Sequence, residues 1–267
     1  MKLIKTWLLT LMCIAVSSCS LIDGGGCLPK DDTPGQYRVS SLQYYFSDNT
    51  SNPVKFIYNA QGVLLRKDWY NIKNEVDFYE DFIYEQGLLT KIKRNLSKTD
   101  FAEVRFIHED GLTKILEYWM EDANANLKKS HSIEFQYNEG QISKSISTFY
   151  DGSPAYYSLY TFANGNIVSV KAYNLATNKL LEENTYEYDN NLNPFYKLSN
   201  QYLGSPIASS KNNVVHYKIV SYKPIPQNPE LSYAYTYNEK GYPVEKYIIG
   251  NAGKKYLDEA FTYELSH

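Results

Sequence analysis

The stretch Tyr84-Glu85-Gln86-Gly87-Leu88 decides the fold of this chain, because it reads as the end of one strand, a tight turn and the start of the next strand. Glycine in such a stretch supplies the positive φ that a short hairpin turn needs. Variants of it, with an aromatic residue, one to three polar residues and then Gly or Asn, recur along the sequence: Tyr58 to Gly62, His108 to Gly111, Tyr137 to Gly140, Phe162 to Gly165, Tyr188 to Asn191 and Tyr237 to Gly241. The chain is therefore built from repeats.

The residues around each copy alternate between apolar and polar. In residues 132–137, for example, Ile133, Phe135 and Tyr137 alternate with polar side chains, which is typical of strands with one buried face. Midway between the turns lies a second set of polar segments, which predicts loops at the opposite end of the strands; Gly204 to Asn212 is one of them. Two strands per repeat predict an all-β, antiparallel up-and-down meander of tandem β-hairpins, with about 16–18 strands in a curved sheet or a barrel-like closure.

Two segments are harder to place in this pattern. Asn191 and Gly241 lie two repeat lengths apart, and we assign the missing turn to a degenerate copy at Asn213. Residues 118–129 could form a turn or two of helix or a longer loop. The first strand is expected near Ser40 to Phe46 and the last near Ala260 to Leu265.

The N-terminus has the features of a secretory signal peptide. Lys2 and Lys5 precede an apolar run that is too short to span a bilayer, and the small residues Ser17 and Ser18 precede Cys19. This segment resembles a bacterial lipobox, which implies that Cys19 is diacylated and becomes the new N-terminus. We therefore predict a lipoprotein signal peptide in residues 1–18, a flexible tether in residues 19–36 and a single β-repeat domain in residues 37–267.

Composition narrows the classes of partner. Loss of Lys2 and Lys5 with the signal leaves 25 of the 27 basic residues against 30 acidic ones, a mildly acidic balance that argues against nucleic acid. Beyond the signal, no stretch is apolar for as long as a transmembrane helix requires. With Cys19 acylated, Cys27 is the last thiol of the mature chain, which leaves neither a disulfide framework nor a cysteine metal site. We expect no cofactor.

The sequence contains no convincing catalytic or metal-binding motif. Asp189, Asn191 and Asn193 have the spacing of the first ligands of a calcium loop, but Pro194 follows where glycine is needed, so we interpret them as a repeat turn. The acid-base cluster at residues 108–110 likewise occupies a turn position. Adjacent acids along a strand point to opposite faces and do not converge. We predict no catalytic residue and no metal site.

Aromatic and basic side chains remain as candidates for binding. Most of the 27 tyrosines suit strands and a core, but five aromatic residues near strand ends are weak candidates for stacking on sugar rings or peptide: Trp69, Tyr70, Trp119, Tyr156 and Tyr157. A lysine follows nearly every turn, as Lys67, Lys144 and Lys246 do. We interpret these lysines as a solvated sheet face, which argues against a lipid-facing barrel wall.

The repeat resembles the YD, or RHS-type, repeats of bacterial surface and toxin proteins, in which a hairpin ends in Tyr-Asp-x-x-Gly; only Tyr188-Asp189 keeps the literal pair here. Over residues 37–267 the chain is more similar to Bacteroidetes lipoproteins of a domain-of-unknown-function family with a porin-like fold. This resemblance implies a barrel-like meander and no known activity.

Together these features predict a non-enzymatic protein of the bacterial cell envelope. We expect it to be anchored to a membrane through Cys19, with the outer membrane preferred, and to face the periplasm or the cell surface. A glycan or an envelope protein is the expected partner, bound through loops and aromatic rows. Two alternatives stay open: a hydrolase that acts on polysaccharide or lipid, and a purely structural or assembly lipoprotein.

Overall fold

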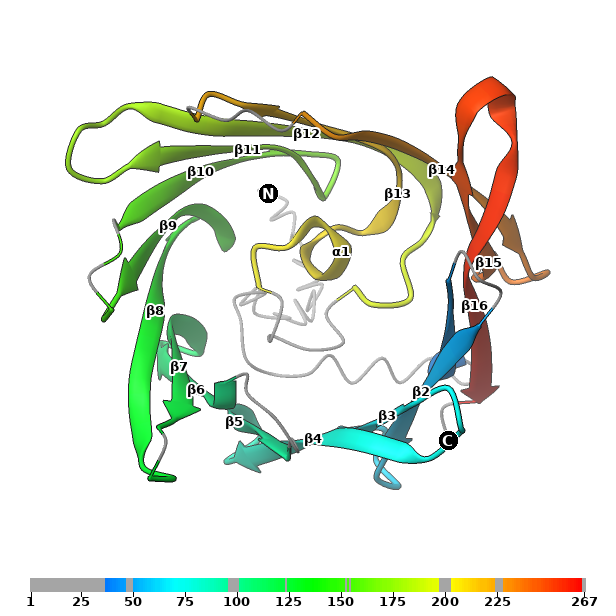
Figure 1. Cartoon of the computed structure of the whole chain (residues 1–267), viewed down its shortest axis with the longest axis horizontal. Coiled ribbons are helices and arrows are strands. Elements are labelled where there is room, and N and C mark those ends of the chain that lie inside the picture. The colour runs from blue at the N-terminus through cyan, green and yellow to red at the C-terminus, as the bar shows by residue number, and fades with distance from the viewer. Residues whose placement is uncertain are drawn as a thin grey trace, which may run out of the picture.

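Sixteen antiparallel strands close into one barrel in the computed structural model, which describes residues 37–46, 50–95, 101–122, 124–151, 153, 155–196, 203–223 and 228–265. Figure 1 looks down the barrel. Each strand pairs with its neighbours in sequence, and β1 pairs with β16 to close the sheet. The strands are β1 (Tyr37–Tyr45), β2 (Ser51–Tyr58), β3 (Leu64–Tyr70), β4 (Val76–Glu85), β5 (Leu88–Asn95), β6 (Phe101–Glu109), β7 (Leu112–Glu121), β8 (Leu127–Asn138), β9 (Gln141–Phe149), β10 (Tyr156–Ala163), β11 (Asn166–Asn174), β12 (Leu180–Leu192), β13 (Asn212–Ser221), β14 (Glu230–Tyr237), β15 (Pro243–Ile249) and β16 (Lys255–Leu265).

The predicted meander is thus confirmed, and the repeat's turns have the expected chemistry. Gln86 and Gly87 both have positive φ, of 52° and 80°, between the paired residues Glu85 and Leu88. Positive φ at both central residues defines the type I′ turn, whose twist matches that of the flanking strands. The same pair of positive φ values recurs in three other hairpins, at Asp110 and Gly111, Glu139 and Gly140, and Asn164 and Gly165.

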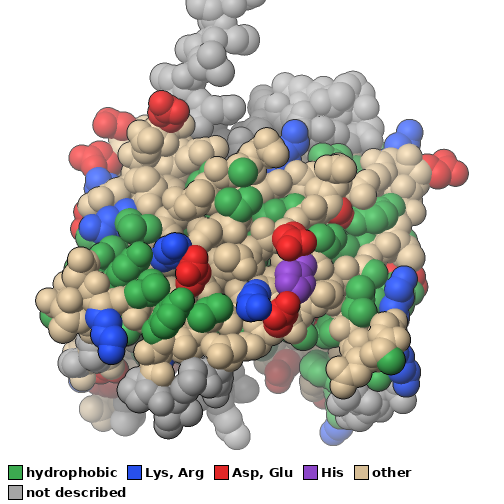
Figure 2. Space-filling view, turned by 90° about the horizontal axis from the view of Figure 1, so that it is seen from above, with side chains coloured by type: hydrophobic (Ala, Val, Ile, Leu, Met, Phe, Trp, Pro, Cys, Tyr) green, Lys and Arg blue, Asp and Glu red, His purple; other side chains and the backbone are tan. Residues whose placement is uncertain are grey.

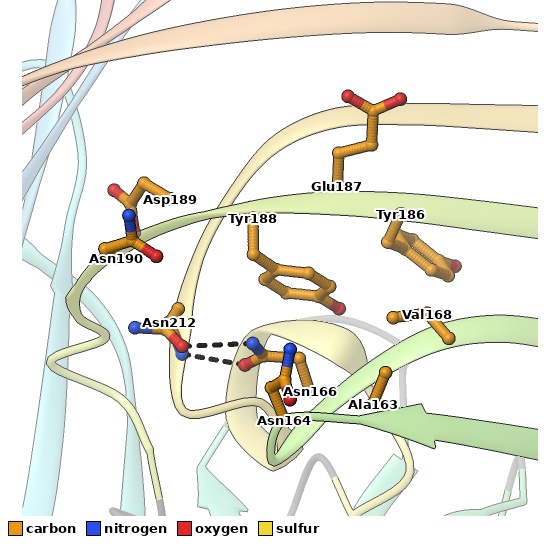
Figure 3. Close-up of a pocket in the computed structure, with 10 residues that line it drawn as sticks. All are labelled: Ala163, Asn164, Asn166, Val168, Tyr186, Glu187, Tyr188, Asp189, Asn190 and Asn212. Carbon is orange, nitrogen blue, oxygen red and sulfur yellow. Dashed lines mark hydrogen bonds between the residues drawn. The ribbon is translucent and has the colours of Figure 1, made fainter.

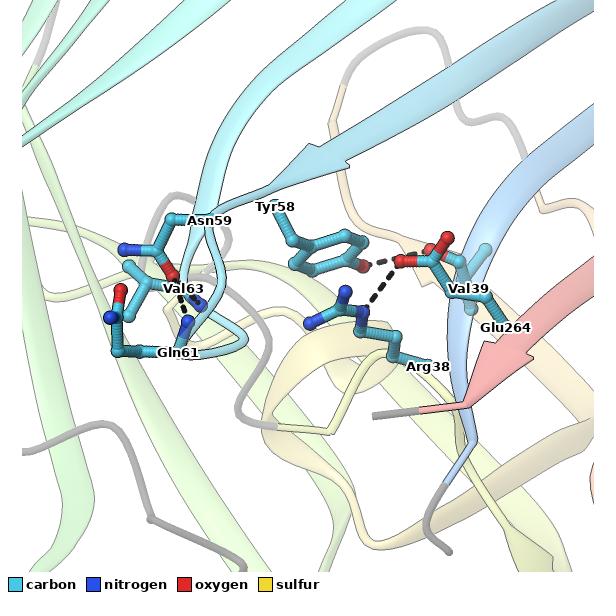
Figure 4. Close-up of polar contacts among 7 residues, drawn as sticks. All are labelled: Arg38, Val39, Tyr58, Asn59, Gln61, Val63 and Glu264. Atoms are coloured by element: carbon cyan, nitrogen blue, oxygen red, sulfur yellow. Dashed lines mark hydrogen bonds and ion pairs between the residues drawn. The ribbon is translucent and has the colours of Figure 1, made fainter. Parts of the chain in front are cut away.

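Several tyrosines near the hairpin-turn ends of strands tie one hairpin to the one before it. The hydroxyl of Tyr58 donates a hydrogen bond of 2.8 Å to the backbone oxygen of Val39, beside the ion pair of Arg38 and Glu264 (Figure 4). We call this hydrogen bond, from a tyrosine near the hairpin-turn end of a strand to a backbone oxygen about 20 residues earlier, the tyrosine latch. Four further tyrosines make it: Tyr137 to Thr113, Tyr188 to Ile167, Tyr235 to Val214 and Tyr263 to Pro243. At Tyr58, Tyr137 and Tyr188 the aromatic residue of the repeat motif itself makes this contact between neighbouring hairpins.

The predicted turns at residues 191 and 213 are wrong. Asn191 lies inside β12 and Asn213 inside β13, and the backbone between these strands forms one long connection instead of two hairpins. The connection carries the short helix α1 (Pro206–Ser209), which Figure 1 shows inside the ring of strands. The segment from Gly204 to Asn212, predicted as a loop at the opposite end of the strands, belongs to this connection except for its last residue, which starts β13. Its Gly-Ser-Pro sequence caps and starts α1, since the Ser205 side chain accepts a hydrogen bond from the Ile207 amide.

Residues 118–129 also differ from the prediction. They form the end of β7, a turn and the start of β8, with no helix among the residues described there. The Asp122 carboxylate accepts hydrogen bonds from the amides of Asn124 and Asn126, which closes the turn. These hydrogen bonds, with Lys128, hold the pKa of Asp122 at about 2.

The apolar core lies on the inner side of the barrel. It is built from buried residues of β1 to β9 and of β16, which alternate along β2 and β6 as the period-two pattern predicted. Register shifts widen the spacing to three residues between Val39 and Leu42 and between Leu89 and Ile92. Phe195, from the long connection, packs its ring 6.2 Å from Phe56 and 6.0 Å from Phe261. The connection therefore completes the core from within the barrel.

Two of the predicted surface lysines point inward instead. Lys67 is 5% exposed, with its ammonium 3.9 Å from the Glu80 carboxylate, and burial lowers the pKa of Lys67. The ammonium of Lys246 lies 2.8 Å from the carboxylates of both Asp258 and Glu259. A buried lysine is tolerated when it is paired with carboxylates, and sequence periodicity alone does not reveal that pairing.

The outer wall carries ion pairs between neighbouring strands. Lys129 lies 3.0 Å from Glu117, and Lys171 lies 3.1 Å from Glu183. Figure 2 shows basic, acidic and apolar side chains interspersed over one side of the barrel. A lysine that faced lipid at mid-bilayer would cost about 2–4 kcal/mol, and an acidic side chain would cost less. Among the described residues, no helix has the length and apolar character needed to cross a membrane.

Candidate functional site

A pocket opens in the barrel wall where β11 and β12 separate. Their pairing stops at Ser169 and Thr185, while β12 continues to Leu192 along β13. The opening has a volume of about 230 Å³ (Figure 3). It is lined by Ala163, Asn164, Asn166, Val168, Tyr186, Glu187, Tyr188, Asp189, Asn190 and Asn212.

Two asparagines hold the pocket's inner edge through reciprocal hydrogen bonds. The side-chain amide of Asn166 donates to Asn212 at 3.0 Å, and the backbone amide of Asn212 donates to the Asn166 side chain at 2.9 Å. Asn212 also donates to the backbone oxygen of Asn191 at 2.9 Å. These bonds join β11 to β13 and β13 to the end of β12.

The ring of Tyr188 forms the centre of the pocket in Figure 3. Its hydroxyl donates to the Ile167 oxygen at 2.5 Å and accepts from the Ser210 hydroxyl at 2.9 Å. Ser210 in turn accepts from the Ile167 amide at 3.0 Å. Burial raises the pKa of Tyr188 to about 12, so the phenol is neutral at physiological pH. The tyrosine latch of this repeat thereby also anchors the long connection.

Asp189 is a structural acceptor at the pocket's end. Its carboxylate accepts hydrogen bonds from the amides of Asn191 and Asn213 and from the hydroxyl of Tyr237. Burial, with the hydrogen bond and charge of Asp189, raises the pKa of Tyr237. The side chain of Asn193 donates instead to the Ile207 and Ser210 oxygens. Residues 189, 191 and 193, which have the spacing of calcium ligands, therefore help to anchor the long connection between β12 and β13.

The pocket presents neutral, planar polar groups beside aromatic rings. Asn164 and Asn190 are exposed at its mouth, and Tyr186 and Tyr188 contribute the rings. Glu187 is exposed as well, and in Figure 3 its carboxylate points away from both rings. Carboxamides donate and accept hydrogen bonds at once, as hydroxyl groups do. The arrangement suits a neutral ligand that is rich in hydroxyls.

Two of the five predicted aromatic residues line the inner wall. Trp69 stacks between Tyr44 and Phe78, with ring centroids 6.0 and 5.2 Å away. Tyr156 packs 5.9 Å from Phe149 in a separate inner row. Neither lies in the pocket between β11 and β12.

The other three lie on the outer wall, each beneath a cation of a neighbouring strand. The distances from cation to ring centroid are 4.8 Å for Lys55 and Tyr70, 3.9 Å for Arg105 and Trp119, and 4.6 Å for Lys144 and Tyr157. The structure does not bring the five aromatic residues together in one site. Cys19, the predicted lipidation site, lies outside the described residues.

Sequence reasoning missed the pocket because three of its four asparagines, Asn164, Asn190 and Asn212, were assigned to turns or loops. Asn164 does lie in a turn, with a φ of 53°. Asn166, Asn190 and Asn212 lie in strands, and the register shifts between β12 and β13 bring them to the opening. An excess of asparagine at three neighbouring strand ends was the available signal.

No family model and no curated protein matches this chain. Two solved structures share its fold. A porin-like protein from Bacteroides vulgatus ATCC 8482 is 14% identical and has a TM-score of 0.57, covering 86% of this chain and 99% of its own. A porin-like protein from Bacteroides uniformis ATCC 8492 is 12% identical and has a TM-score of 0.51, covering 85% of this chain and 96% of its own. At these identities the likeness shows the fold alone, and that fold is a porin-like barrel.

Proposed function

We propose that this chain is a non-enzymatic, lipid-anchored protein of the bacterial cell envelope that binds a neutral glycan in the pocket between β11 and β12. The observation that carries the proposal is the pocket's lining of carboxamides beside two tyrosine rings. Sugar hydroxyls match the carboxamides, and the apolar faces of pyranose rings match the tyrosines. The pocket's acids lie at its edges.

The fold and the N-terminal sequence support the proposed location in the cell envelope. A porin-like barrel is compatible with an outer-membrane or envelope location, and the two structural neighbours are described as porin-like. The signal sequence with Cys19 supports an anchor, and the charged outer wall supports anchorage in preference to a lipid-embedded barrel.

The pocket supports a hydrolytic function less well than it supports glycan binding. Catalysis by two carboxylates requires one to act as an acid and the other as a base or nucleophile. Asp189 already accepts hydrogen bonds from three residues, and Glu187 points away from the pocket's rings. The pocket therefore favours binding without bond cleavage.

A glycan array probed with residues 20–267 tests the proposal, followed by titration calorimetry with the strongest ligand. Asn190→Ala removes an exposed carboxamide from the lining and should weaken binding by up to about tenfold, the value of one hydrogen bond. Glu134→Gln, on the exposed outer face of β8, is the matched control and should bind as the parent does. Absence of any array ligand, or equal affinity of the Asn190 variant and the parent, would count against this pocket.

A further inference from the structure

The pocket between β11 and β12 is closed at both of its ends along the strands. At one end the two strands are paired from Ser169 and Thr185 onward. At the other end the last residue of the long connection links the two sides: the Lys211 amide donates to the Gly165 oxygen at 3.1 Å, and the Lys211 oxygen accepts from the Asn193 amide at 3.0 Å. A glycan chain therefore cannot run through the gap parallel to the strands.

The inner side of the pocket is closed as well. The Tyr188 hydroxyl donates to the Ile167 oxygen and accepts from the Ser210 hydroxyl, and both of these partners are 0% exposed. The helix α1, which directly precedes Ser210, contacts β11 and β13 and buries Ala208. In Figure 3 the α1 ribbon lies behind Asn166. The pocket is therefore a recess in the barrel wall, which these residues separate from the interior.

The open side of the recess faces outward. Four of its lining residues are exposed: Ala163, Asn164, Glu187 and Asn190. Asn164 lies in the hairpin turn between β10 and β11, and Asn190 lies near the end of β12. These positions place the mouth on the outer surface of the barrel, at the hairpin-turn end of the strands.

The size of the recess limits how much of a ligand it can enclose. Its volume of about 230 Å³ is below the range of about 300–1,000 Å³ that encloses drug-sized ligands. A single sugar ring fits such a space, and a second ring stays outside, beside the carboxamides of Asn164 and Asn190 at the mouth.

We propose that the recess binds a glycan end-on, by its non-reducing terminal residue. This mode of binding rests on the proposed function and adds which part of the glycan enters. An internal residue is joined to a sugar on each side, and the closed ends of the recess leave no path for both neighbours. A terminal residue has one neighbour, which can leave through the mouth.

The lining suits the non-reducing end in particular. The ring of that residue is held closed by its glycosidic bond, so both of its faces stay defined for contact with Tyr186 and Tyr188. All of its hydroxyls except the anomeric one are free to exchange hydrogen bonds with carboxamides. A reducing end, whose ring opens in water, presents no such fixed shape.

Titration calorimetry with three related probes tests the proposal. The protein is residues 20–267, which keep the whole barrel because the sheet closes between β1 and β16 within residues 37–265. The probes are the strongest neutral glycan of the array, the same glycan with one further sugar on its non-reducing end, and the methyl glycoside of the original terminal residue. We expect the methyl glycoside to retain most of the affinity and the extended glycan to bind at least about tenfold more weakly.

A substitution that fills the recess provides a second test. Val168→Phe places a larger side chain in the lining and should weaken binding of the methyl glycoside by at least about tenfold. Val220→Phe is the matched control: it changes a half-buried valine of β13 that lies opposite Glu183, away from the recess, and should bind as the parent does. Thermal unfolding of both variants checks that the barrel is intact.

The outcomes separate this mode of binding from glycan binding itself. Undiminished affinity of the extended glycan, or an affinity that rises with each added sugar while the methyl glycoside fails to bind, would overturn end-on binding and leave glycan binding in place. Equal affinity of Val168→Phe and the parent would overturn the assignment to this recess. Absence of any array ligand would count against the proposed function, and end-on binding would fall with it.

Discussion

His108 occupies the place of a tyrosine: its Nε2 lies 2.7 Å from the backbone oxygen of Leu89, 19 residues earlier. Tyr58 reaches Val39 over the same separation. The sequence of residues 108–110 suggests acid-base chemistry, but these residues lead into a hairpin turn. The His108 imidazole takes the place of the tyrosine hydroxyl in the latch. We expect His108→Tyr to keep or raise the free energy of unfolding and His108→Phe to lower it, as measured by urea denaturation.

Removal of a latch hydroxyl should destabilise the barrel. Tyr137→Phe deletes the 2.6 Å hydrogen bond to the Thr113 oxygen and keeps the ring in the core, so we expect a loss of about 1 kcal/mol in the free energy of unfolding. Tyr222→Phe, at a ring that is 47% exposed, is the control and should change stability by less than about 0.5 kcal/mol. Equal effects of the two substitutions would contradict the role assigned to the latch.

Buried tyrosines should also make the protein sensitive to alkali. Burial raises the pKa values of Tyr84, Tyr118 and Tyr188 from 10.0 to about 12. An unfolded tyrosine ionises near pH 10 while the folded one keeps its proton, so stability is complete below pH 10 and falls as pH rises toward 12. Each tyrosine contributes at most about 1.4 kcal/mol per pH unit in that window. Urea unfolding between pH 9 and 12 should show this fall, and Tyr188→Phe should reduce its slope.

Acid should destabilise the protein through His131. Its imidazole is stacked 4.0 Å from the Tyr118 ring, and burial lowers the pKa of His131, although Asp151 opposes that shift. The unfolded chain therefore takes up a proton near pH 6.5 before the folded chain does, so this contribution to stability is present above pH 6.5 and is lost as pH falls below it. Thermal melts from pH 7 to 5 should show a smaller fall for His131→Phe than for the parent.

Two glycines with the same φ should respond differently to alanine. Gly87 and Gly204 both have a φ of 80°, which costs an alanine about 1–2 kcal/mol. A Cβ on Gly87 would meet no atom within 4 Å, whereas one on Gly204 would lie 2.9 Å from the Tyr160 hydroxyl. We expect Gly204→Ala to lower the melting temperature more than Gly87→Ala does. The reverse order would mean that the long connection does not pack against β10 as described.

Local chemistry by itself determined most of the architecture. The Gly and polar residues of stretches such as Tyr84 to Gly87 require positive φ, and positive φ at two successive residues makes a hairpin whatever surrounds it. The alternation of Ile133, Phe135 and Tyr137 with polar residues likewise assigns one face of a strand to the core. These rules act over a few residues, and for that reason the number and direction of the strands followed from them.

Tertiary structure alone decided the rest, because it depends on contacts between residues that are far apart in sequence. Asn191 and Asn213 look like turn residues but lie in strands, since Tyr188, Ser210 and the Asn166–Asn212 pair hold one long connection inside the barrel. The pocket exists only because β11 and β12 lose their register beyond Ser169 and Thr185. Closure of the barrel required β1 to meet β16, a pairing of the two ends of the chain that no local pattern can specify.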